Sequence, residues 1–299
     1  MEYPMATLLR NSSLGGAFHE WMHSWYQGML GTNESMYAWM DEGFTTYAEG
    51  RVSAYYYEQL LARHPDNAGL KDLVNKRRTQ LPLIQPTAYE GYFALAKAGM
   101  AEPLTTHADH FHTNLAYETA AYSEGCIYLE QLGYIVGDSV RDRILLEYYH
   151  EWRFKHPNAS DFRRVAEKVS GMQLDWYQEY WVNTTKTIDY GIDSLWEENG
   201  KSKIRLKMEG DMPMPIDVLL TFKNGSRMMA YIPQYFMFGA KPEEDHSVPR
   251  TQYEPWKWTS PTYTFEFDRR LLDLKIVEID PTQRMADTDR RNNKLELKW

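Results

Sequence analysis

The chain has 299 residues and a formal net charge of −9. A negative balance argues against a nucleic-acid-binding protein, because a phosphate backbone must be met by Lys and Arg. Cys126 is the single cysteine, which excludes an internal disulfide and a multi-cysteine zinc site. No apolar run approaches the length of a membrane span, so no membrane span is predicted.

The first segments alternate between strand and helix character. Alternating side chains predict one short strand over residues 1–10. Gly15-Gly16 then predicts a break before a helix of roughly residues 17–30. Within that helix, a separate apolar stripe is expected to face the core: Phe18, Met22, Trp25 and Met29.

Helical patterns continue through the next part of the chain. A second helix is predicted from near Asp41 to about Arg63, and apolar residues at helical spacing predict another from Tyr117 to about Leu132. Further helices are predicted at about 138–154, 159–169 and 173–182.

Strand patterns replace helical ones near residue 186. Ile204, Leu206 and Met208 alternate with basic residues, and similar runs surround positions 218–222, 263–267 and 276–279. Asn224-Gly225 lies between two of these runs and is a strong hairpin signal. We therefore predict an α+β protein with a mainly helical domain at 1–184 and a β-rich, sandwich-like domain at 185–299.

The run His19-Glu20-Trp21-Met22-His23 carries the chemistry. In an α-helix, residues four apart lie about 40° apart on one face, one turn from each other, so His19 and His23 could share one metal ion. Glu20 lies about 100° from His19, where its carboxylate could reach a metal-bound water. The alternative for such a run alone is an amphipathic helix with solvated His and Glu.

A third ligand is expected because a catalytic zinc site usually has three protein ligands and an open position. Glu42 opens the second predicted helix, and eighteen residues separate it from His23. That connection is long enough to let the second helix pack back against the first. Together, His19, His23 and Glu42 predict a zinc site.

These motifs resemble those of the membrane alanyl aminopeptidase family of gluzincin zinc metallopeptidases. The family pattern is HExxH, eighteen residues and then Glu, usually followed by Gly, and both halves of it match here. The resemblance implies a thermolysin-like catalytic domain, one Zn2+ per chain held by His19, His23 and Glu42, and Glu20 as general base. It implies removal of N-terminal residues from peptides that carry a free N-terminus.

Two further roles rest on the resemblance. Tyr122, followed by Ser123, Glu124 and Gly125, matches the segment whose tyrosine donates to the oxyanion, although Glu124 stands where the family usually has Lys. Glu2 matches the glutamate that binds the substrate's α-amine. Because the chain begins at that motif, we expect a bacterial member truncated at its N-terminus, with an upstream domain missing.

Supporting residues and rival interpretations complete the prediction. Glu49 lies two turns after Glu42 and either accepts the second N–H of a zinc-bound histidine or belongs to a solvated face; Asp41 is a weaker candidate for the same work. The group around His107 and His110 is read as a polar loop, with a second metal as the alternative. The rival functions are an endopeptidase of the same clan and a catalytically silent binding protein.

Overall fold

The structure is a computed structural model that describes residues 2–3, 6–79 and 85–298. Helices occupy the first part of the chain and strands the second, so the predicted α+β class is confirmed. The change falls between Asn183 and Tyr190. No helix among the described residues is long and apolar enough to cross a membrane.

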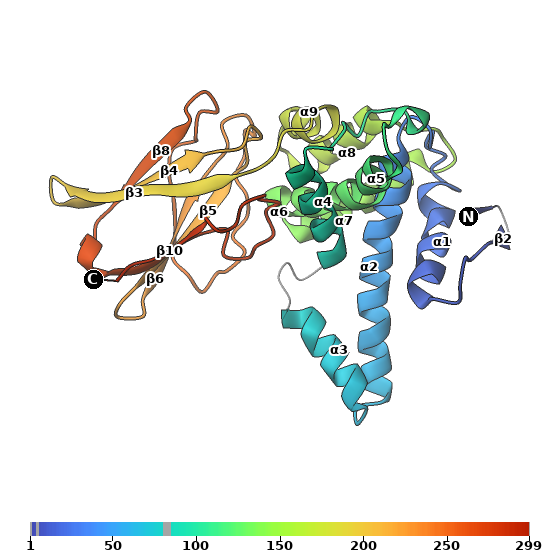
Figure 1. Cartoon of the computed structure of the whole chain (residues 1–299), viewed down its shortest axis with the longest axis horizontal. Coiled ribbons are helices and arrows are strands. Elements are labelled where there is room, and N and C mark those ends of the chain that lie inside the picture. The colour runs from blue at the N-terminus through green and yellow to red at the C-terminus, as the bar shows by residue number, and fades with distance from the viewer. Residues whose placement is uncertain (1, 4–5, 80–84, 299) are drawn as a thin grey trace.

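The helical part is shown on the right of Figure 1, with long α2 beside α1 and α3 folded back along α2. The helices are α1 (Leu14–Tyr26), α2 (Ala38–Arg63), α3 (Ala68–Thr79), α4 (Pro86–Ala98), α5 (Asn114–Glu118), α6 (Gly125–Val136), α7 (Asp138–Trp152), α8 (Ala159–Ser170) and α9 (Asp175–Asn183), with short turns η1 (Ala108–His110) and η2 (Thr119–Glu124).

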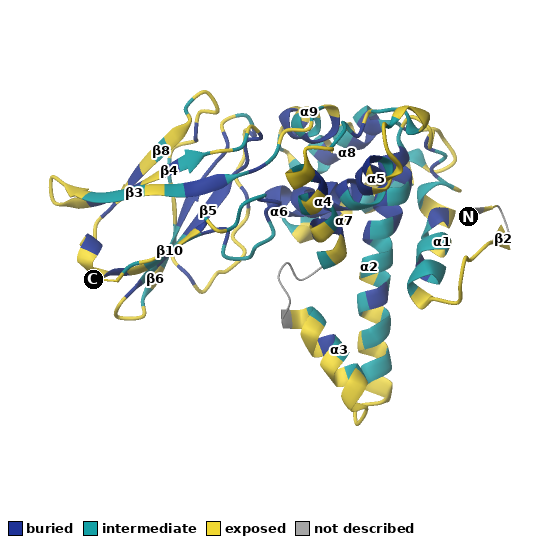
Figure 2. Ribbon diagram, viewed as in Figure 1, coloured by how far each residue is buried: buried dark blue, intermediate teal, exposed yellow. Residues whose placement is uncertain are grey.

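Helix α6 is the centre of the helical part. Every one of its residues from Gly125 to Val136 is buried, and Cys126, Ile127 and Leu129 are fully enclosed. Helices α2, α4, α7 and η2 pack around it. Most of its side chains are apolar, and such a helix is stable only when it is covered on every side. Figure 2 shows α6 buried, on the side of the helical part that faces the strands.

The strand part contains two sheets at the left of Figure 1, antiparallel throughout except for the parallel pairing of β6 with β7. One sheet has the order β10-β9-β5-β6-β7 and the other β3-β4-β8. The strands are β3 (Tyr190–Glu198), β4 (Lys201–Met208), β5 (Ile216–Phe222), β6 (Arg227–Ile232), β7 (Arg250–Gln252), β8 (Thr262–Phe267), β9 (Leu274–Ile279) and β10 (Lys294–Glu296), with a short turn η3 (Leu271–Asp273). The predicted hairpin is confirmed: β5 pairs with β6, and Gly225 has a φ of 83°.

Three predictions for the N-terminal segments are wrong. The described residues at 1–10 form two short strands, β1 (Glu2–Tyr3) and β2 (Ala6–Thr7), that pair with each other; the intervening sequence contains Pro4, which lacks the N–H that a continuous ladder uses. Gly15-Gly16 lies within α1, because the helix begins at Leu14, where the Ser13 side chain caps it by accepting the Gly16 N–H. The expected apolar stripe is broken, since Trp25 is exposed while His23 is buried.

Candidate metal centre

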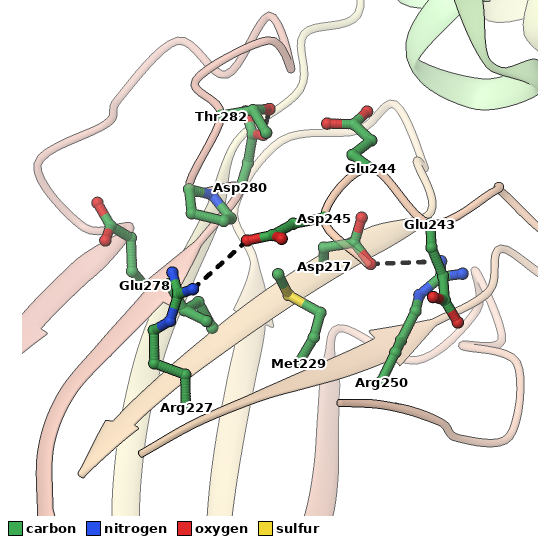
Figure 3. A pocket seen from close by; sticks show the side chains of 12 residues that line it. Asp217, Arg227, Met229, Glu243, Glu244, Asp245, Arg250, Glu278, Asp280 and Thr282 are labelled. Carbon is green, nitrogen blue, oxygen red and sulfur yellow. Dashed lines mark hydrogen bonds and ion pairs between the residues drawn. The ribbon is translucent and has the colours of Figure 1, made fainter. Parts of the chain in front are cut away.

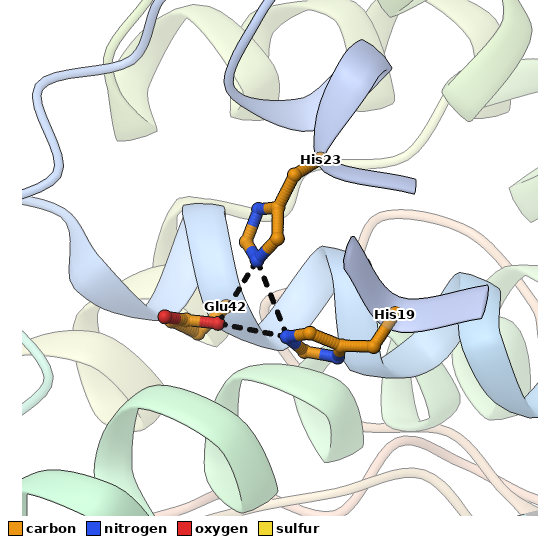
Figure 4. Close-up of side chains that lie close together, drawn as sticks. All are labelled: His19, His23 and Glu42. Atoms are coloured by element: carbon orange, nitrogen blue, oxygen red, sulfur yellow. Dashed lines mark hydrogen bonds and ion pairs between the residues drawn. The ribbon is translucent and has the colours of Figure 1, made fainter. Parts of the chain in front are cut away.

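Helices α1 and α2 bring three predicted ligands together. The Nε2 atoms of His19 and His23 lie 3.2 Å apart, and Oε2 of Glu42 lies 3.0 Å from the first and 3.2 Å from the second. Figure 4 shows all three side chains converging from the two helices. Within the described residues, these three form the one group of His, Cys, Asp or Glu side chains placed to hold a metal ion.

The spacing of these atoms fits a zinc ion. Zinc binds His nitrogen and carboxylate oxygen at about 2.0–2.2 Å in tetrahedral geometry, which places ligand atoms about 3.3 Å from each other. The observed separations of 3.0–3.2 Å are close to that value. The donor set of two imidazoles and one carboxylate is also one that catalytic zinc sites use.

The outer nitrogens of both imidazoles have carboxylate partners. Nδ1 of His23 lies 2.9 Å from Oδ1 of Asp41, and Nδ1 of His19 lies 3.4 Å from Oε2 of Glu49. Donation of an Nδ1 proton to a carboxylate leaves the Nε2 lone pair free to bind a metal. The two predicted supporting acids therefore lie where such a role requires them.

Charge around the two imidazoles favours a cation. Burial lowers the pKa of His19, but its hydrogen bonds to Glu42 and Glu49 outweigh burial and raise the pKa to about 9. Burial also lowers the pKa of His23, but Asp41 and Glu42 outweigh burial and raise this pKa to about 10. Burial raises the pKa of Glu42, yet the two histidines lower it to about 2, so this carboxylate stays ionised.

Tyr122 lies beside the ligands. Its ring stacks on that of His19 with centroids 5.7 Å apart, and its hydroxyl donates to the Glu42 carboxylate. Burial and the charge of Glu42 raise the pKa of Tyr122 well above its usual value, so the hydroxyl keeps its proton. The residue sits in η2, a π-helical turn, and such turns are frequent at functional sites.

A close helix crossing sets the distance between Glu42 and Tyr122. A Cβ added to Gly43 would lie 2.5 Å from Cα of Gly125 and 2.9 Å from the carbonyl oxygen of Ala121. Only glycine at this position permits α2 to approach η2 and α6 so closely. The glycine after the third ligand thus has a packing role.

Thr45 was not predicted from the sequence. It is fully buried, and its Oγ1 lies 3.2 Å from Nδ1 of His23, on the same nitrogen that faces Asp41. The signal was present, since Thr45 lies one turn after Asp41 on α2. Position alone, however, does not separate it from the many other polar residues on that helix.

The remaining predicted residues are placed less fully. Glu20 follows His19 on α1 and is half-buried. Glu2 belongs to β1, and its side chain lies outside the described part. In the predicted polar loop around His107 and His110, those two rings lie 4.9 Å apart. His112 instead pairs with Glu102 at 2.9 Å.

Two cavities differ in their relation to this centre. One of about 710 Å3 reaches His19 and Tyr122 and extends along α2; Glu20 is not among the described residues that line it. Another of about 340 Å3 lies among the strands (Figure 3). Its two arginines pair with acids of the same lining, Arg227 with Asp245 at 3.7 Å and Arg250 with Asp217 at 3.4 Å. None of the candidate ligands lines it, so of these two cavities the first is the one connected to the candidate chemistry.

Comparison with known proteins gives the same assignment for the helical part. Human aminopeptidase B is 28% identical over 207 residues, which is 62% of this chain and 26% of that protein. The Xenopus laevis leukotriene A-4 hydrolase is 26% identical over 204 residues, 62% of this chain and 30% of that protein. The chain therefore spans about a quarter to a third of the length of these curated relatives.

Among solved structures, an M1 zinc metallopeptidase from Deinococcus radiodurans matches with a TM-score of 0.40 and 20% identity, covering 57% of this chain and 33% of that one. The Legionella pneumophila aminopeptidase A matches with a TM-score of 0.49 and 12% identity, covering 90% and 26%. Residues 12–181, more than half of the chain and all three candidate ligands, match the Peptidase family M1 domain, and the chain belongs to that family.

Proposed function

We propose that this chain carries the catalytic centre of a zinc-dependent aminopeptidase. The observation that carries the proposal is the convergence of His19, His23 and Glu42 to 3.0–3.2 Å beside Tyr122, inside a Peptidase family M1 domain. Relatives named aminopeptidase B support peptides with a free N-terminus as the substrate class. One Zn2+ per chain is the proposed cofactor.

The proposed ligands have carboxylate neighbours on their outer sides. Asp41 beside His23 and Glu49 beside His19 are the proposed acceptors of the outer N–H groups, a role that would orient each Nε2 toward a bound ion. A zinc ion bound there supplies an activated water at neutral pH and polarises the scissile carbonyl. The chain's own residues must then manage the proton and the oxyanion.

Glu20 and Tyr122 are the proposed groups for those two tasks. Glu20 takes a proton from the attacking water and passes it to the leaving amine, as a general base that then acts as an acid. Tyr122 donates its hydroxyl hydrogen to the oxyanion of the tetrahedral intermediate, and its raised pKa keeps that hydrogen available.

The exopeptidase preference is assigned to Glu2, whose carboxylate would bind the substrate's α-amine. Residues 1–184 form the proposed catalytic domain and residues 185–299 a β-sandwich-like domain. The change from helix to strand between Asn183 and Tyr190 supports that boundary.

The test is hydrolysis of a panel of aminoacyl amides and their N-acetylated forms by the zinc-loaded protein, with and without a chelator. Free-amine substrates should be cleaved, acetylated ones spared, and the chelator should abolish turnover. Glu20→Gln should keep the zinc and lose about 10²–10⁴-fold in rate, the usual loss for a missing acid–base group.

Glu34→Gln is the matched control, because Glu34 is an exposed carboxylate on the connection between α1 and α2. It should leave the rate unchanged. A Glu20→Gln protein that retains zinc and turns over at the wild-type rate would exclude Glu20 as the base. Hydrolysis that resists the chelator would exclude the zinc mechanism.

A further inference from the structure

The cavity beside the candidate ligands has opposite charges at its two ends. His19, Glu49 and Tyr122 line one end, and Lys76 and Arg77 of α3 line the other. We propose that Lys76 and Arg77 bind a carboxylate of a short peptide whose N-terminal residue lies at the candidate metal centre. This proposal rests on the proposed function and adds the class of substrate.

The distance between the two ends of the cavity can be estimated along helix α2. At one end, Glu49 lies 3.4 Å from His19. At the other, the guanidinium carbon of Arg77 lies 4.9 Å from the centroid of the Tyr57 ring. Eight residues separate Glu49 from Tyr57, which at 1.5 Å per residue is about 12 Å. An extended peptide advances about 3.3–3.6 Å per residue, so three to four residues span that distance.

The basic end is fixed against α2. Val74 of α3 is buried, and the neighbouring Arg78 pairs with Glu58 of α2 at 3.1 Å. On the other side, the Gln85 amide donates to the carbonyl oxygens of Thr46 and Tyr47, both at 3.1 Å. Gln85 can approach because Gly50 has no Cβ to block it. Helix α3 is therefore packed against α2, and Arg77 lies over Tyr57 at the far end of the cavity from the candidate ligands.

Arg77 is better suited to this role than an ordinary basic residue at a helix end. Lys and Arg are common in the last turn, where they complement the helix dipole, and Arg78 illustrates this by pairing outside the cavity. Arg77 is half-buried, lines the cavity, and lies over the Tyr57 ring. A guanidinium held in this way can present two parallel N–H donors to a carboxylate.

The arrangement of charge matches a free peptide. Glu42 and Glu49 lie at the metal end, and Lys76 and Arg77 lie at the far end. A peptide with a positive amine and a negative carboxylate would align with its N-terminus toward the metal end. The carboxylate could be the C-terminus of a three- or four-residue peptide or an acidic side chain at the same distance.

Binding measured by calorimetry tests the proposal without relying on turnover. The zinc-loaded Glu20→Gln protein is titrated with three peptides: tetra-alanine as the free acid, tetra-alanine amide, and an amide whose fourth residue is Asp. The free acid should bind at least tenfold more tightly than tetra-alanine amide. Tight binding of the Asp peptide as well would mean that any carboxylate at that distance is accepted, and weak binding would restrict the site to the C-terminus.

Substitutions locate the carboxylate site. Arg77→Gln, and separately Lys76→Gln, should reduce the acid-to-amide ratio toward one, while Arg77→Lys should retain part of it. Lys71→Gln is the matched control, because Lys71 is an exposed cation on α3 away from the cavity lining, and it should keep the full ratio. Equal binding of acid and amide, or a ratio unchanged in both Gln variants, would overturn the proposal. Hydrolysis of aminoacyl amides by the wild-type protein tests the proposed function separately, because those substrates are too short to reach α3.

Discussion

At the residue scale, the candidate centre shows two histidines in different surroundings. His23 is almost fully enclosed between Asp41 and Thr45, whereas His19 lies at the cavity wall beside Glu49 and Tyr122. Both imidazoles share the Glu42 carboxylate, so negative charge surrounds the point where their Nε2 atoms meet. That charge attracts a proton when no metal is bound, and protons and zinc therefore compete for the same nitrogens.

Proton release on zinc binding is the first prediction from this competition. Because the pKa values of His19 and His23 are raised to about 9 and about 10, the metal-free site holds protons at pH 7 that zinc must displace. At least one proton should be released per ion. The apparent affinity should rise about tenfold per pH unit for each proton released, until the pH passes those pKa values.

Calorimetry of zinc binding in buffers with different ionisation enthalpies measures the proton count directly. His107→Ala provides a control, since His107 is not one of the three candidate ligands, and it should leave the count unchanged. Zinc binding with no proton release between pH 6 and pH 8 would contradict the charge balance described for the site.

Tyr122→Phe should lower kcat more than it changes KM, because the proposed hydrogen bond to the oxyanion forms mainly in the transition state. Losing one such donor costs about 2.7–4 kcal/mol, or about 10²–10³-fold in rate. Tyr55→Phe, at an exposed tyrosine of α2, is the control and should have little effect. A change confined to KM would make Tyr122 a binding residue only.

Residue-level prediction from the sequence worked where spacing and chemistry coincide. The His19–His23 spacing and the later Glu42 nominated three residues that the structure brings together, although their binding of metal stays a prediction. The sequence also predicts the two supporting acids, Glu49 from its helical register and Asp41 only as a weaker candidate. Thr45 was missed because its role depends on the direction of the His23 ring, which sequence spacing does not specify.

At the scale of elements, the crossing of α2 with η2 and α6 determines the site. Gly43 and Gly125 let the backbones touch. Glu42 directly precedes Gly43, and Tyr122 lies three residues before Gly125. The crossing therefore joins the third candidate ligand to the proposed oxyanion donor. A change that widens it should disturb both groups together.

Gly43→Ala tests that crossing. The added methyl would collide with Gly125 and Ala121, and overpacking of this kind usually costs about 1–3 kcal/mol of folding free energy. Zinc affinity should fall as well, because Glu42 moves with the backbone. Chemical denaturation and a zinc competition titration measure the two effects.

Gly69→Ala is the matched control for this substitution. Gly69 lies in α3, and the nearest atom to an added Cβ is Oδ1 of Asn67 at 3.5 Å, so alanine should be neutral or add up to about 1 kcal/mol through helix propensity. If Gly43→Ala were as stable as Gly69→Ala and bound zinc equally well, the close crossing would have no energetic importance.

Sequence patterns located most helices and strands but missed some elements for identifiable reasons. Helix α3 has few apolar residues and depends on Val74 and the Arg78–Glu58 pair against α2, so its pattern is weak. Helix α4 could have been found, since Pro86 opens it and Gly99 ends it with a φ of 65°. The π turn η2 has no sequence signature. In α1, the face toward α2 carries the histidines, which leaves Trp21 and Trp25 outside.

At the scale of the whole molecule, the strand part is joined to the central helix by buried hydrogen bonds. The Gln131 amide of α6 donates to the carbonyl oxygen of Arg284 at 2.7 Å and accepts the Ala286 N–H at 2.9 Å. Tyr89 of α4 donates to the same Arg284 oxygen at 2.6 Å. The Arg284 side chain pairs with Asp138 at the start of α7. The segment after β9 is thereby fixed to three helices.

This interface leads to the last prediction, which concerns cooperativity. Gln131→Leu leaves the buried Ala286 N–H without its partner, at a cost of about 1–3 kcal/mol, while the Arg284 oxygen keeps Tyr89 as a donor. The Tm should fall by about 3–10 °C in calorimetry.

Adding Tyr89→Phe removes the second donor, so the double variant should lose more stability than the sum of the two single variants. Gln252→Leu, an exposed glutamine at the end of β7, is the control and should melt as the wild type does. Zinc affinity should not change in Gln131→Leu, because Gln131 lies six residues along α6 from Gly125, which contacts Gly43. A Gln131→Leu protein that loses zinc without losing stability would mean that the strand part positions the site directly, and that the helices alone do not determine it.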